Sequence, residues 1–562
     1  MPTTTHDTPR SERTASDAPP AEPAHTDDAS RRETRIAAGL VIACLLITAV
    51  FGQLSPRGVL QFDDLTHYLY AKWAWTWPAY LLDAWGRPGF TALYFIPARF
   101  GWPACRLLSA ALMAGSAWFA FRIAQRMGLR HAWGVVLFCY AQPLFFQLSE
   151  TTLTETPLTF YLTFAVFLAL SGRWSLSAAV LSIGLVTRHE AIIFLPVWAW
   201  LARKQRIRLV RLWPLLLAPL LVNLLAVAAD LRPALVSLLE PRATTQYGFG
   251  GWLTFVARSL HAWGPAVAVL IIVGIRPMAR RPGGLMPVLV VAVFFGAQTV
   301  IRALGLFGSG GYARFLVPIG PLAAIAALEG WHRLRGVGRD DRRRALILAA
   351  GAMLFLWVSM ERELVLIARG AAAGSEVVRL AEARRAVEIM TVLFTLLVLA
   401  ELRRWRTSFG TKRNPALVPT ALVVIMGLTC FVCCRPLPPP REAPLIARMM
   451  RDLAAKGLGG REIISANIWI DDVTRRELPP RRPSVREQLQ LAPLGTLFAW
   501  ERQFAASEDH KLSLAEFLES PAFRLVLRTP PRAGAREPYL TVFEKVGPWG
   551  PRPLGPPIQT QD

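Results

Sequence analysis

Charged side chains are scarce in this chain of 562 residues. They make up 18% of it, whereas soluble globular chains carry about 25%, and most of them cluster between long apolar runs. Apolar runs of about 20 residues without charge are typical of membrane-spanning helices. We therefore expect a polytopic α-helical membrane protein, and not the several soluble domains that the length alone would predict.

Cysteine is also scarce. The six residues all lie in or beside apolar runs, at Cys44, Cys105, Cys139, Cys430, Cys433 and Cys434. No disulfide framework is therefore expected. The last three resemble a metal or redox motif, but small apolar residues within a span are the favoured interpretation.

Acidic residues are outnumbered, with 39 against 63 basic ones and a formal net charge of +24. In a soluble protein this excess would indicate a nucleic-acid partner. Here the arginines lie mainly in short loops between apolar runs, such as 203–211 and 333–344, as the positive-inside rule predicts. No aromatic-basic motif accompanies them, so no nucleic-acid partner is expected.

The predicted transmembrane domain covers residues 36–434. Residues 1–35 lack the pattern of a cleavable signal peptide and are predicted to form a disordered cytoplasmic tail. About thirteen spans are predicted, at 36–54, 104–121, 132–147, 156–171, 175–187, 190–202, 212–229, 259–275, 285–301, 315–331, 345–360, 386–401 and 416–434. The pair 175–187 and 190–202 forms either two short helices meeting at depth or one span with a re-entrant piece.

Basic loops set the predicted orientation. Five of them alternate correctly with the spans and are expected in the cytoplasm: 122–130, 203–211, 276–281, 333–344 and 403–413. Segment 361–385 is an exception, because it carries five arginines yet falls outside. The outer side then holds 55–103, 148–155, 187–190, 230–258, 302–314 and everything from Pro436 onward. The membrane is expected to be the cell membrane (the inner or plasma membrane).

Two further units follow the spans. Residues 435–445 form a Pro-rich linker, which is expected to act as a semi-rigid spacer. Residues 446–562 are predicted to form a small extracytoplasmic α/β domain, large enough for its own core. Its expected strands are 462–470, 495–500, 523–527 and 540–543, and its expected helices are 441–456 and 513–519. No internal repeat is evident.

Two adjacent carboxylates follow the first span. Residues 62–68 read Phe-Asp-Asp-Leu-Thr-His-Tyr, and further aromatic residues follow them. Ionisable groups at a membrane boundary are costly and usually functional. Asp63 or Asp64 could serve as a general base toward an acceptor hydroxyl, or could simply cap a helix in a solvated loop.

Other polar groups fall at the same predicted membrane level. They are Glu150, Glu155, Arg188, His189, Glu190, Tyr312 and Arg314. An arginine there suits a phosphate or pyrophosphate. The alternative is mutual neutralisation of charge, for example of Arg188 by Glu155.

The order of these motifs resembles the glycosyltransferase C superfamily. Asp-Asp-x-x-His-Tyr after the first span is similar to its Asp-Asp/Glu-x-x-x-Tyr signature, and within it the chain most resembles protein mannosyltransferase-like and lipid A aminoarabinose transferase-like enzymes. The later marks are Trp-Gly-Arg-Pro at 85–88, Arg-Leu-Leu-Ser at 106–109, Thr-Glu-Thr-Pro at 154–157, Thr-Arg-His-Glu-Ala at 187–191 and Gly-Tyr-Ala-Arg-Phe-Leu-Val-Pro at 311–318. Together the marks cover about residues 36–335.

The resemblance implies a shared fold, a polyprenyl-phosphate sugar donor and an aspartate base in the first outer loop. Asp63 matches the base, and Asp64 stands where the related pattern often has Glu. The substrate-binding residues implied are His67, Tyr68, Arg87, Glu155, Arg188, His189, Glu190, Tyr312 and Arg314. His189 replaces a frequent Pro. A divalent ion held by Asp63 or Asp64 is the one cofactor considered, although no ligand spacing requires it.

The leading hypothesis is an inverting membrane glycosyltransferase. Asp63 would deprotonate an acceptor hydroxyl on a glycan, lipid or protein, and arginines would stabilise the leaving lipid phosphate. The sugar is open, with a mannose-type hexose as one candidate. A transporter or lipid flippase would also explain the spans, but it predicts inverted repeats or broken helices, and the sequence shows neither. A third alternative is a non-catalytic sensor or assembly protein.

Overall fold

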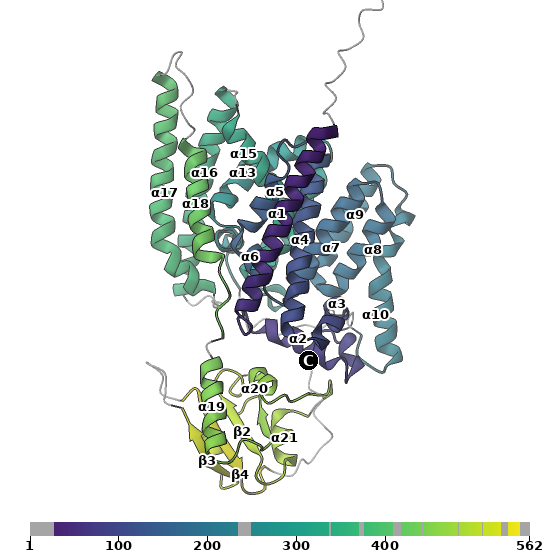
Figure 1. Cartoon of the computed structure of the whole chain (residues 1–562), viewed down its shortest axis with the longest axis vertical. Coiled ribbons are helices and arrows are strands. Elements are labelled where there is room, and N and C mark those ends of the chain that lie inside the picture. Colours follow the sequence, from purple (N-terminus) through teal and green to yellow (C-terminus); the bar gives the residue numbers. More distant parts are fainter. Residues whose placement is uncertain are drawn as a thin grey trace, which may run out of the picture.

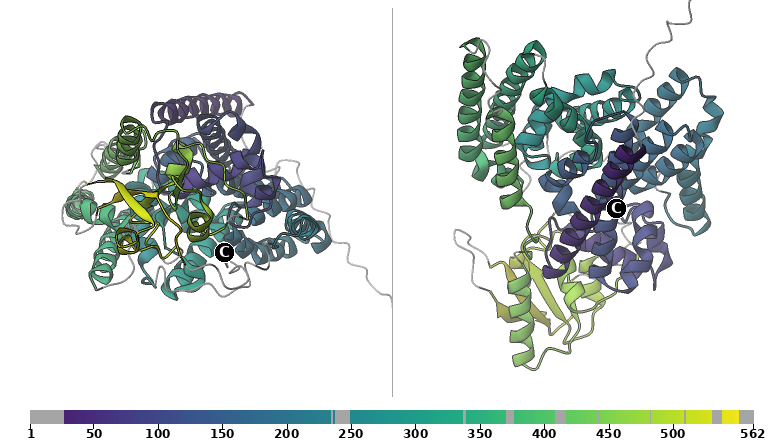
Figure 2. Two further views of the ribbon diagram at one scale, coloured as in Figure 1. Left: turned by 90° about the horizontal axis from the view of Figure 1, so that it is seen from below. Right: turned by 45° about the horizontal axis from the view of Figure 1, so that its top comes forward.

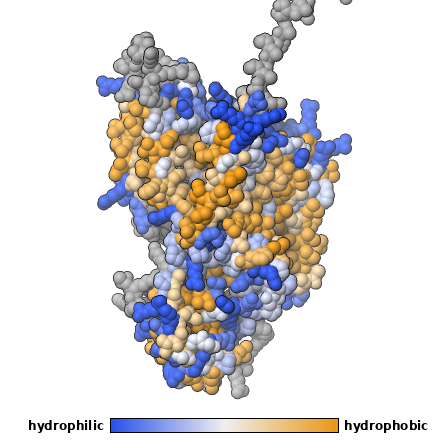
Figure 3. All heavy atoms as spheres, viewed as in Figure 1, coloured by the Kyte–Doolittle hydropathy of each residue, from blue (hydrophilic) through white to orange (hydrophobic). Residues whose placement is uncertain are grey.

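The computed structural model describes residues 27–233, 236, 249–336, 339–369, 376–407, 417–440, 442–481, 483–507, 510–529 and 538–550. Most described residues belong to a helical part, and a small domain with a β-sheet lies at one end of it (Figure 1). An apolar surface covers the flank of the helical part between hydrophilic ends (Figure 3). This is the pattern of a polytopic membrane protein, and it confirms the predicted fold class.

Each predicted span overlaps a helical segment. Outside the first outer loop, the α-helices of this part are α1 (Asp27–Leu54), α4 (Trp102–Arg126), α5 (Gly134–Tyr140), α6 (Pro143–Leu148), α7 (Glu155–Leu170), α8 (Trp174–Thr187), α9 (Phe194–Lys204), α10 (Leu217–Ala228), α12 (Thr254–Ala262), α13 (Pro265–Arg280), α14 (Leu285–Ala303), α15 (Gly320–Arg335), α16 (Arg339–Ala368), α17 (Glu376–Thr407) and α18 (Leu417–Cys433). Short 3₁₀ segments are η2 (His189–Ile193), η3 (Leu209–Leu216), η4 (Leu306–Gly308) and η5 (Ala313–Ile319).

Length and composition separate full spans from shorter helices. Among the described residues, six helical segments are long and apolar enough to cross a membrane, or seven if a bent pair counts as one span. Helices α7, α8 and α18 are apolar but shorter. Helix α1 begins at Asp27. Residues 27–35, which we predicted to be part of a disordered tail, are therefore helical. Residues 1–26 of that predicted tail lie outside the described part.

One predicted span is a broken helix. Helices α12 and α13 meet at an angle of 116°, so the prediction of a continuous helix over 259–275 was wrong. Gly264 at the break has φ 76°, and Pro265 is the first residue of α13. A glycine adopts positive φ at little cost, and a proline cannot continue the hydrogen bonding of the preceding helix.

The uncertain pair of spans is resolved as two helices. Arg188 is extended (φ −148°, ψ 128°) between α8 and η2, and α9 follows η2 directly. Arg188 therefore lies at the break between the two helices, and it is 8% exposed.

The first outer loop, expected to be a loop, contains three helical segments: α2 (Asp63–Trp73), η1 (Pro78–Leu81) and α3 (Pro88–Arg99). They form because their aromatic residues share a core with the small domain. Tyr68 stacks on Trp102 of α4 (5.6 Å between centroids), and Trp102 lies 5.8 Å from Trp469. Aromatic side chains of this size dominate such interfaces.

The C-terminal domain contains a four-stranded sheet with the order β1-β2-β4-β3, made of β1 (Ile463–Ser465), β2 (Leu497–Glu501), β3 (Phe523–Arg528) and β4 (Leu540–Lys545). The pair β1–β2 is parallel, and the other pairs are antiparallel. The helices are α19 (Ala443–Ala455), α20 (Ile468–Val473), α21 (Val485–Leu491) and α22 (Leu514–Leu518). All four predicted strands are confirmed, although the first was too long: the Asn467 side chain caps α20, so residues 468–470 are helical.

The Pro-rich linker, which we predicted to be a spacer, is hydrogen-bonded to the helical part. The Val59 N–H donates to the Pro438 carbonyl (3.0 Å), and the Leu437 N–H donates to Glu150 (3.3 Å). The Ser55 hydroxyl donates to the Leu437 carbonyl. These bonds bind the linker to the turns that follow α1 and α6, beside α2. The C-terminal domain consequently lies against the end of the bundle that carries α2, as two further views confirm (Figure 2).

Candidate active site

Asp63 is the first residue of α2 and keeps 38% of its side chain exposed. The Arg314 guanidinium donates to it, with Nη2 2.7 Å from Oδ2. Burial would raise the pKa of Asp63, but the charge of Arg314 and the hydrogen bond that Arg314 donates outweigh it and lower the pKa. Asp63 is therefore an accessible, ionised carboxylate, as a general base must be.

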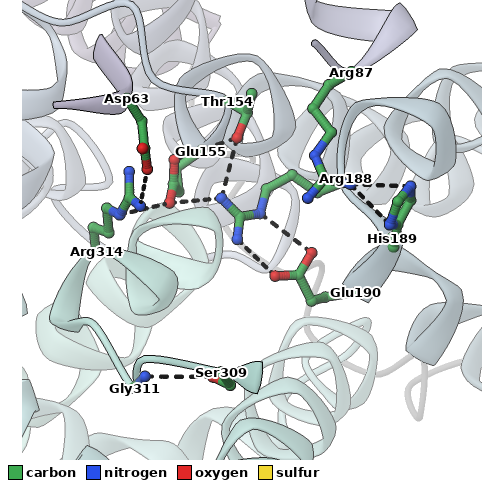
Figure 4. Close-up of polar contacts among 10 residues, drawn as sticks. All are labelled: Asp63, Arg87, Thr154, Glu155, Arg188, His189, Glu190, Ser309, Gly311 and Arg314. Carbon is green, nitrogen blue, oxygen red and sulfur yellow. Dashed lines mark hydrogen bonds and ion pairs between the residues drawn. The ribbon is translucent and has the colours of Figure 1, made fainter. Parts of the chain in front are cut away.

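Glu155 links two arginines behind Asp63. Its Oε1 lies 2.6 Å from Nη1 of Arg188 and 3.2 Å from Nε of Arg314, and the carboxylate is fully buried. Arg188 also holds Glu190, with contacts of 2.6 and 3.3 Å, and donates to the Thr154 hydroxyl at 3.1 Å. Figure 4 shows this line of alternating charges, which starts at Asp63 and ends at Glu190. The predicted pairing of Arg188 with Glu155 is thus present.

Arg87 and His189 lie beside this line. The Arg87 Nη1 lies 2.8 Å from Nδ1 of His189, and Arg87 adopts φ 63° just before Pro88 opens α3. A non-glycine residue at positive φ is strained and often functional. The contact joins the first outer loop to η2, so the two segments that flank the line of charges are tied to each other.

His67 lies one turn after Asp63 on α2. Its ring stacks on Trp85 at 4.9 Å between centroids and approaches Phe90 at 5.2 Å. Burial lowers the pKa of His67 to about 4, so the imidazole is neutral near pH 7. It can therefore accept or donate one hydrogen bond without adding charge.

Asp64 and Tyr68 face away from the line of charges. Asp64 is fully buried and accepts hydrogen bonds from both the N–H and the hydroxyl of Thr152, each at 2.5 Å. Burial raises the pKa of Asp64, even though Arg106 and Thr152 act to lower it. Tyr68 packs on Trp102, in the interface with the C-terminal domain. These contacts indicate that both residues hold α2 in place.

The contacts of the two adjacent carboxylates do not converge on one ion. Asp63 meets Arg314, whereas Asp64 meets Thr152. Across the described ranges, no group of three or more His, Cys, Asp or Glu side chains could hold a metal ion. The geometry thus gives no support to a metal site shared by Asp63 and Asp64.

Phe315 is a residue of the site that the sequence analysis did not name as a binding residue. Phe315 lies under both arginines, 4.8 Å from the guanidinium of Arg188 and 5.6 Å from that of Arg314, and Tyr312 lies 5.2 Å from Arg314. The position of Phe315 inside the motif at 311–318 was the available signal. Aromatic faces attract a guanidinium and help to fix its orientation.

A second buried cluster supports the loop of Arg314. Arg302 donates to the Ser309 carbonyl at 2.8 Å, and its own carbonyl accepts from the Gly250 N–H at 2.9 Å. Arg258 lies 3.5 Å from Glu363, which also accepts from Thr254 at 2.8 Å. The sequence analysis did not single out this cluster, because Arg258 and Arg302 fall at the ends of the predicted outer segments 230–258 and 302–314, and Glu363 falls in segment 361–385.

The helical bundle, the short helices after α1 and the small α/β domain together define a glycosyltransferase C-like membrane fold. The solved structures that share it include ArnT from Cupriavidus metallidurans, in the apo state (TM-score 0.56) and bound to undecaprenyl phosphate (TM-score 0.55). Each is 14% identical to this chain, and each alignment covers 92% of this chain and 99% of ArnT. No family model and no curated protein matches the sequence. The resemblance seen in the sequence is thereby confirmed as a resemblance of fold.

Proposed function

We propose that this protein is an inverting membrane glycosyltransferase that takes a sugar from a polyprenyl-phosphate donor. The observation that carries the proposal is the accessible carboxylate of Asp63, held by Arg314 at the end of a line of buried charges. An exposed base beside buried arginines suits a reaction that removes a proton on one side and releases a phosphate on the other. ArnT, whose fold is similar, has been solved with undecaprenyl phosphate bound.

In the proposed reaction, Asp63 accepts the proton of an acceptor hydroxyl. The oxygen attacks the anomeric carbon of the sugar, and the bond between that carbon and the lipid phosphate oxygen breaks. The leaving polyprenyl phosphate keeps the electron pair, and Arg314 and Arg188 stabilise its negative charge. Arg314 therefore contacts the base and is expected to contact the leaving group, which would align the two reacting partners.

The residues around this line have proposed binding roles. Glu155 and Glu190 orient the arginines, and His67, Arg87, His189 and Tyr312 are proposed to bind the sugar. We place this reaction on the extracytoplasmic face of the cell membrane, where the basic loops put α2 and the C-terminal domain. The acceptor is a glycan, lipid or protein hydroxyl, and a mannose-type hexose is one candidate sugar.

The test is transfer from labelled polyprenyl-phosphate sugars by membranes that contain the protein. The wild type should form a labelled product, and Asp63→Asn should form it about 10²–10⁴-fold more slowly at equal protein level. Absence of transfer from every such donor would contradict the proposal.

One observation favours a transporter or flippase as a second candidate. The sequence showed no broken helix, but α12 and α13 form one, and broken helices often line transport pathways. The two functions are distinguished by measuring whether a lipid-linked sugar crosses the membrane of vesicles that contain the protein. A flippase moves this lipid even when Asp63 is replaced and no acceptor is present.

A further inference from the structure

The C-terminal domain reaches the residue that precedes Asp63. The ring of Phe504 lies 4.3 Å from the ring of Phe62, centroid to centroid, at an interplanar angle of 34°. Phe62 is the N-cap residue of α2, and Asp63 is the first residue inside the helix. A side chain far away in the sequence therefore packs at the start of the helix that carries the proposed base.

Polar contacts and packing both hold the first turn of α2. The N-cap residue Phe62 offers no side-chain hydrogen bond to the helix, although the first N–H groups of a helix have no partner within it. On one side, Thr152 holds Asp64 by two hydrogen bonds. On the other side, Arg314 holds the carboxylate of Asp63, and the packing of Phe504 on Phe62 restrains the residue just before it.

Phe504 is itself firmly placed. The carboxylate of Glu501, at the end of β2, accepts hydrogen bonds from the backbone N–H of Gln503 (2.9 Å) and of Phe504 (3.0 Å). Glu501 is 2% exposed, and its carbonyl accepts from the Ala505 N–H at 3.0 Å. The loop therefore extends rigidly from the sheet, so Phe504 can transmit the position of the domain to α2.

The same interface has anchors far from Asp63. The Tyr80 hydroxyl of η1 donates to the Leu478 carbonyl at 2.7 Å, and the Thr76 hydroxyl donates to Glu477 at 2.9 Å. These contacts attach the domain to the opposite end of α2 and to η1. A variant there can weaken the interface without touching the first turn of α2, and so provides a matched control.

We propose that Phe504 is a positioning residue of the active site: by packing on Phe62 it holds the first turn of α2 and sets the carboxylate of Asp63 relative to Arg314. The effect on turnover rests on the proposed function. The effect on the first turn of α2 does not, and the two are measured separately.

The experiment compares Phe504→Ala, Phe504→Leu and Tyr80→Phe in the full-length protein, purified in detergent. Hydrogen exchange of a peptide covering residues 60–70 reports the first turn of α2. Transfer assays give kcat and the KM for the donor. Phe504→Ala should speed exchange in residues 60–70 and leave exchange in β2 and β4 unchanged. It should lower kcat about tenfold or more with the donor KM unchanged, because a misplacement of about 1 Å can cost about 10²-fold.

Phe504→Leu refills most of the lost volume and should restore most of kcat, whereas Tyr80→Phe should leave kcat as it is. Unchanged exchange in Phe504→Ala overturns the proposal, whatever the activity. Faster exchange with an unchanged kcat overturns the link to Asp63. If Phe504→Ala also speeds hydrogen exchange in β2 and β4, the test moves to Phe504→Leu. Its exchange in residues 60–70 and its kcat must then lie between those of the wild type and those of Phe504→Ala. A wild type without transfer refutes the proposed function, and hydrogen exchange still decides the contact.

Discussion

Replacing Asp63 with Asn should lower turnover by about 10²–10⁴-fold, the usual contribution of a positioned general base. In free energy this is a rise of about 2.7–5.4 kcal/mol in the barrier. Asn has the same size, and its oxygen can still accept the hydrogen bond that Arg314 donates at 2.7 Å. What it lacks is the negative charge that accepts a proton.

The surrounding charges predict where the loss will appear. With Asp63 neutral, Arg314 loses the negative charge of this partner and still lies 3.2 Å from Glu155, so its attraction for a donor phosphate should not weaken. The loss is therefore expected in kcat, with the donor KM equal or lower. Because Arg314 holds the pKa of Asp63 below its usual range, this group should cause no pH dependence of wild-type turnover between about pH 5 and 8.

The assay is single-turnover transfer from a labelled polyprenyl-phosphate sugar, at equal amounts of folded protein. Asp64→Asn is the matched control, since it makes the same change one residue later, at a buried carboxyl held by Thr152. Asp64→Asn should lower the free energy of unfolding, and it should reduce turnover less than Asp63→Asn does. Full activity in Asp63→Asn, or a larger loss of turnover in Asp64→Asn, would refute the assignment and move the base to Asp64 or Glu155.

Three further predictions follow from other contacts. Arg188→Lys and Arg314→Lys keep the charge but lose the forked geometry, so each should raise the donor KM without unfolding the protein; wild-type kinetics in both would make these arginines structural. Burial raises the pKa of Glu150 from 4.5 to about 8, so stability should be lost as pH rises through this window, at about 1.4 kcal/mol per pH unit. Glu150→Gln should remove that loss of stability. Thermal unfolding of the wild type and the variant at pH 5 and pH 9 measures it. A variant that loses as much stability as the wild type between these pH values would contradict the prediction. A reporter that is active only outside the cytoplasm, fused after Gln561, should be active, and a cytoplasmic signal would reverse the sidedness of every site proposed here.

Local patterns predicted the helices well, because each apolar run buries itself in a membrane whatever the rest of the chain does. The four strands of the C-terminal domain were predicted for a similar reason, from short apolar segments between turn residues. The break at Gly264 was missed because the apolar run continues through it. Helices α2 and α3 were missed because their stability comes from contacts with residues hundreds of positions away, such as Trp469.

The candidate site was predictable only in part. The outer-side motifs named Asp63, Glu155, Arg188, Glu190 and Arg314, and the structure brings these five together. The opposite orientations of the two adjacent aspartates depend on the rotation of α2, which no local pattern specifies. That rotation is set by contacts between segments far apart in the sequence, which depend on the tertiary packing.

The bound linker also orders events during synthesis. The loop after α1 leaves the ribosome early, but two of its hydrogen-bond partners, Leu437 and Pro438, are made some 380 residues later. At roughly 5–20 residues per second, about 20 s or more separates the two. Throughout that interval α2 lacks both the linker and Phe504. A nascent or truncated chain would therefore hold the described membrane helices but lack both contacts, so the proposed transfer should reach its full rate only once the last domain has folded.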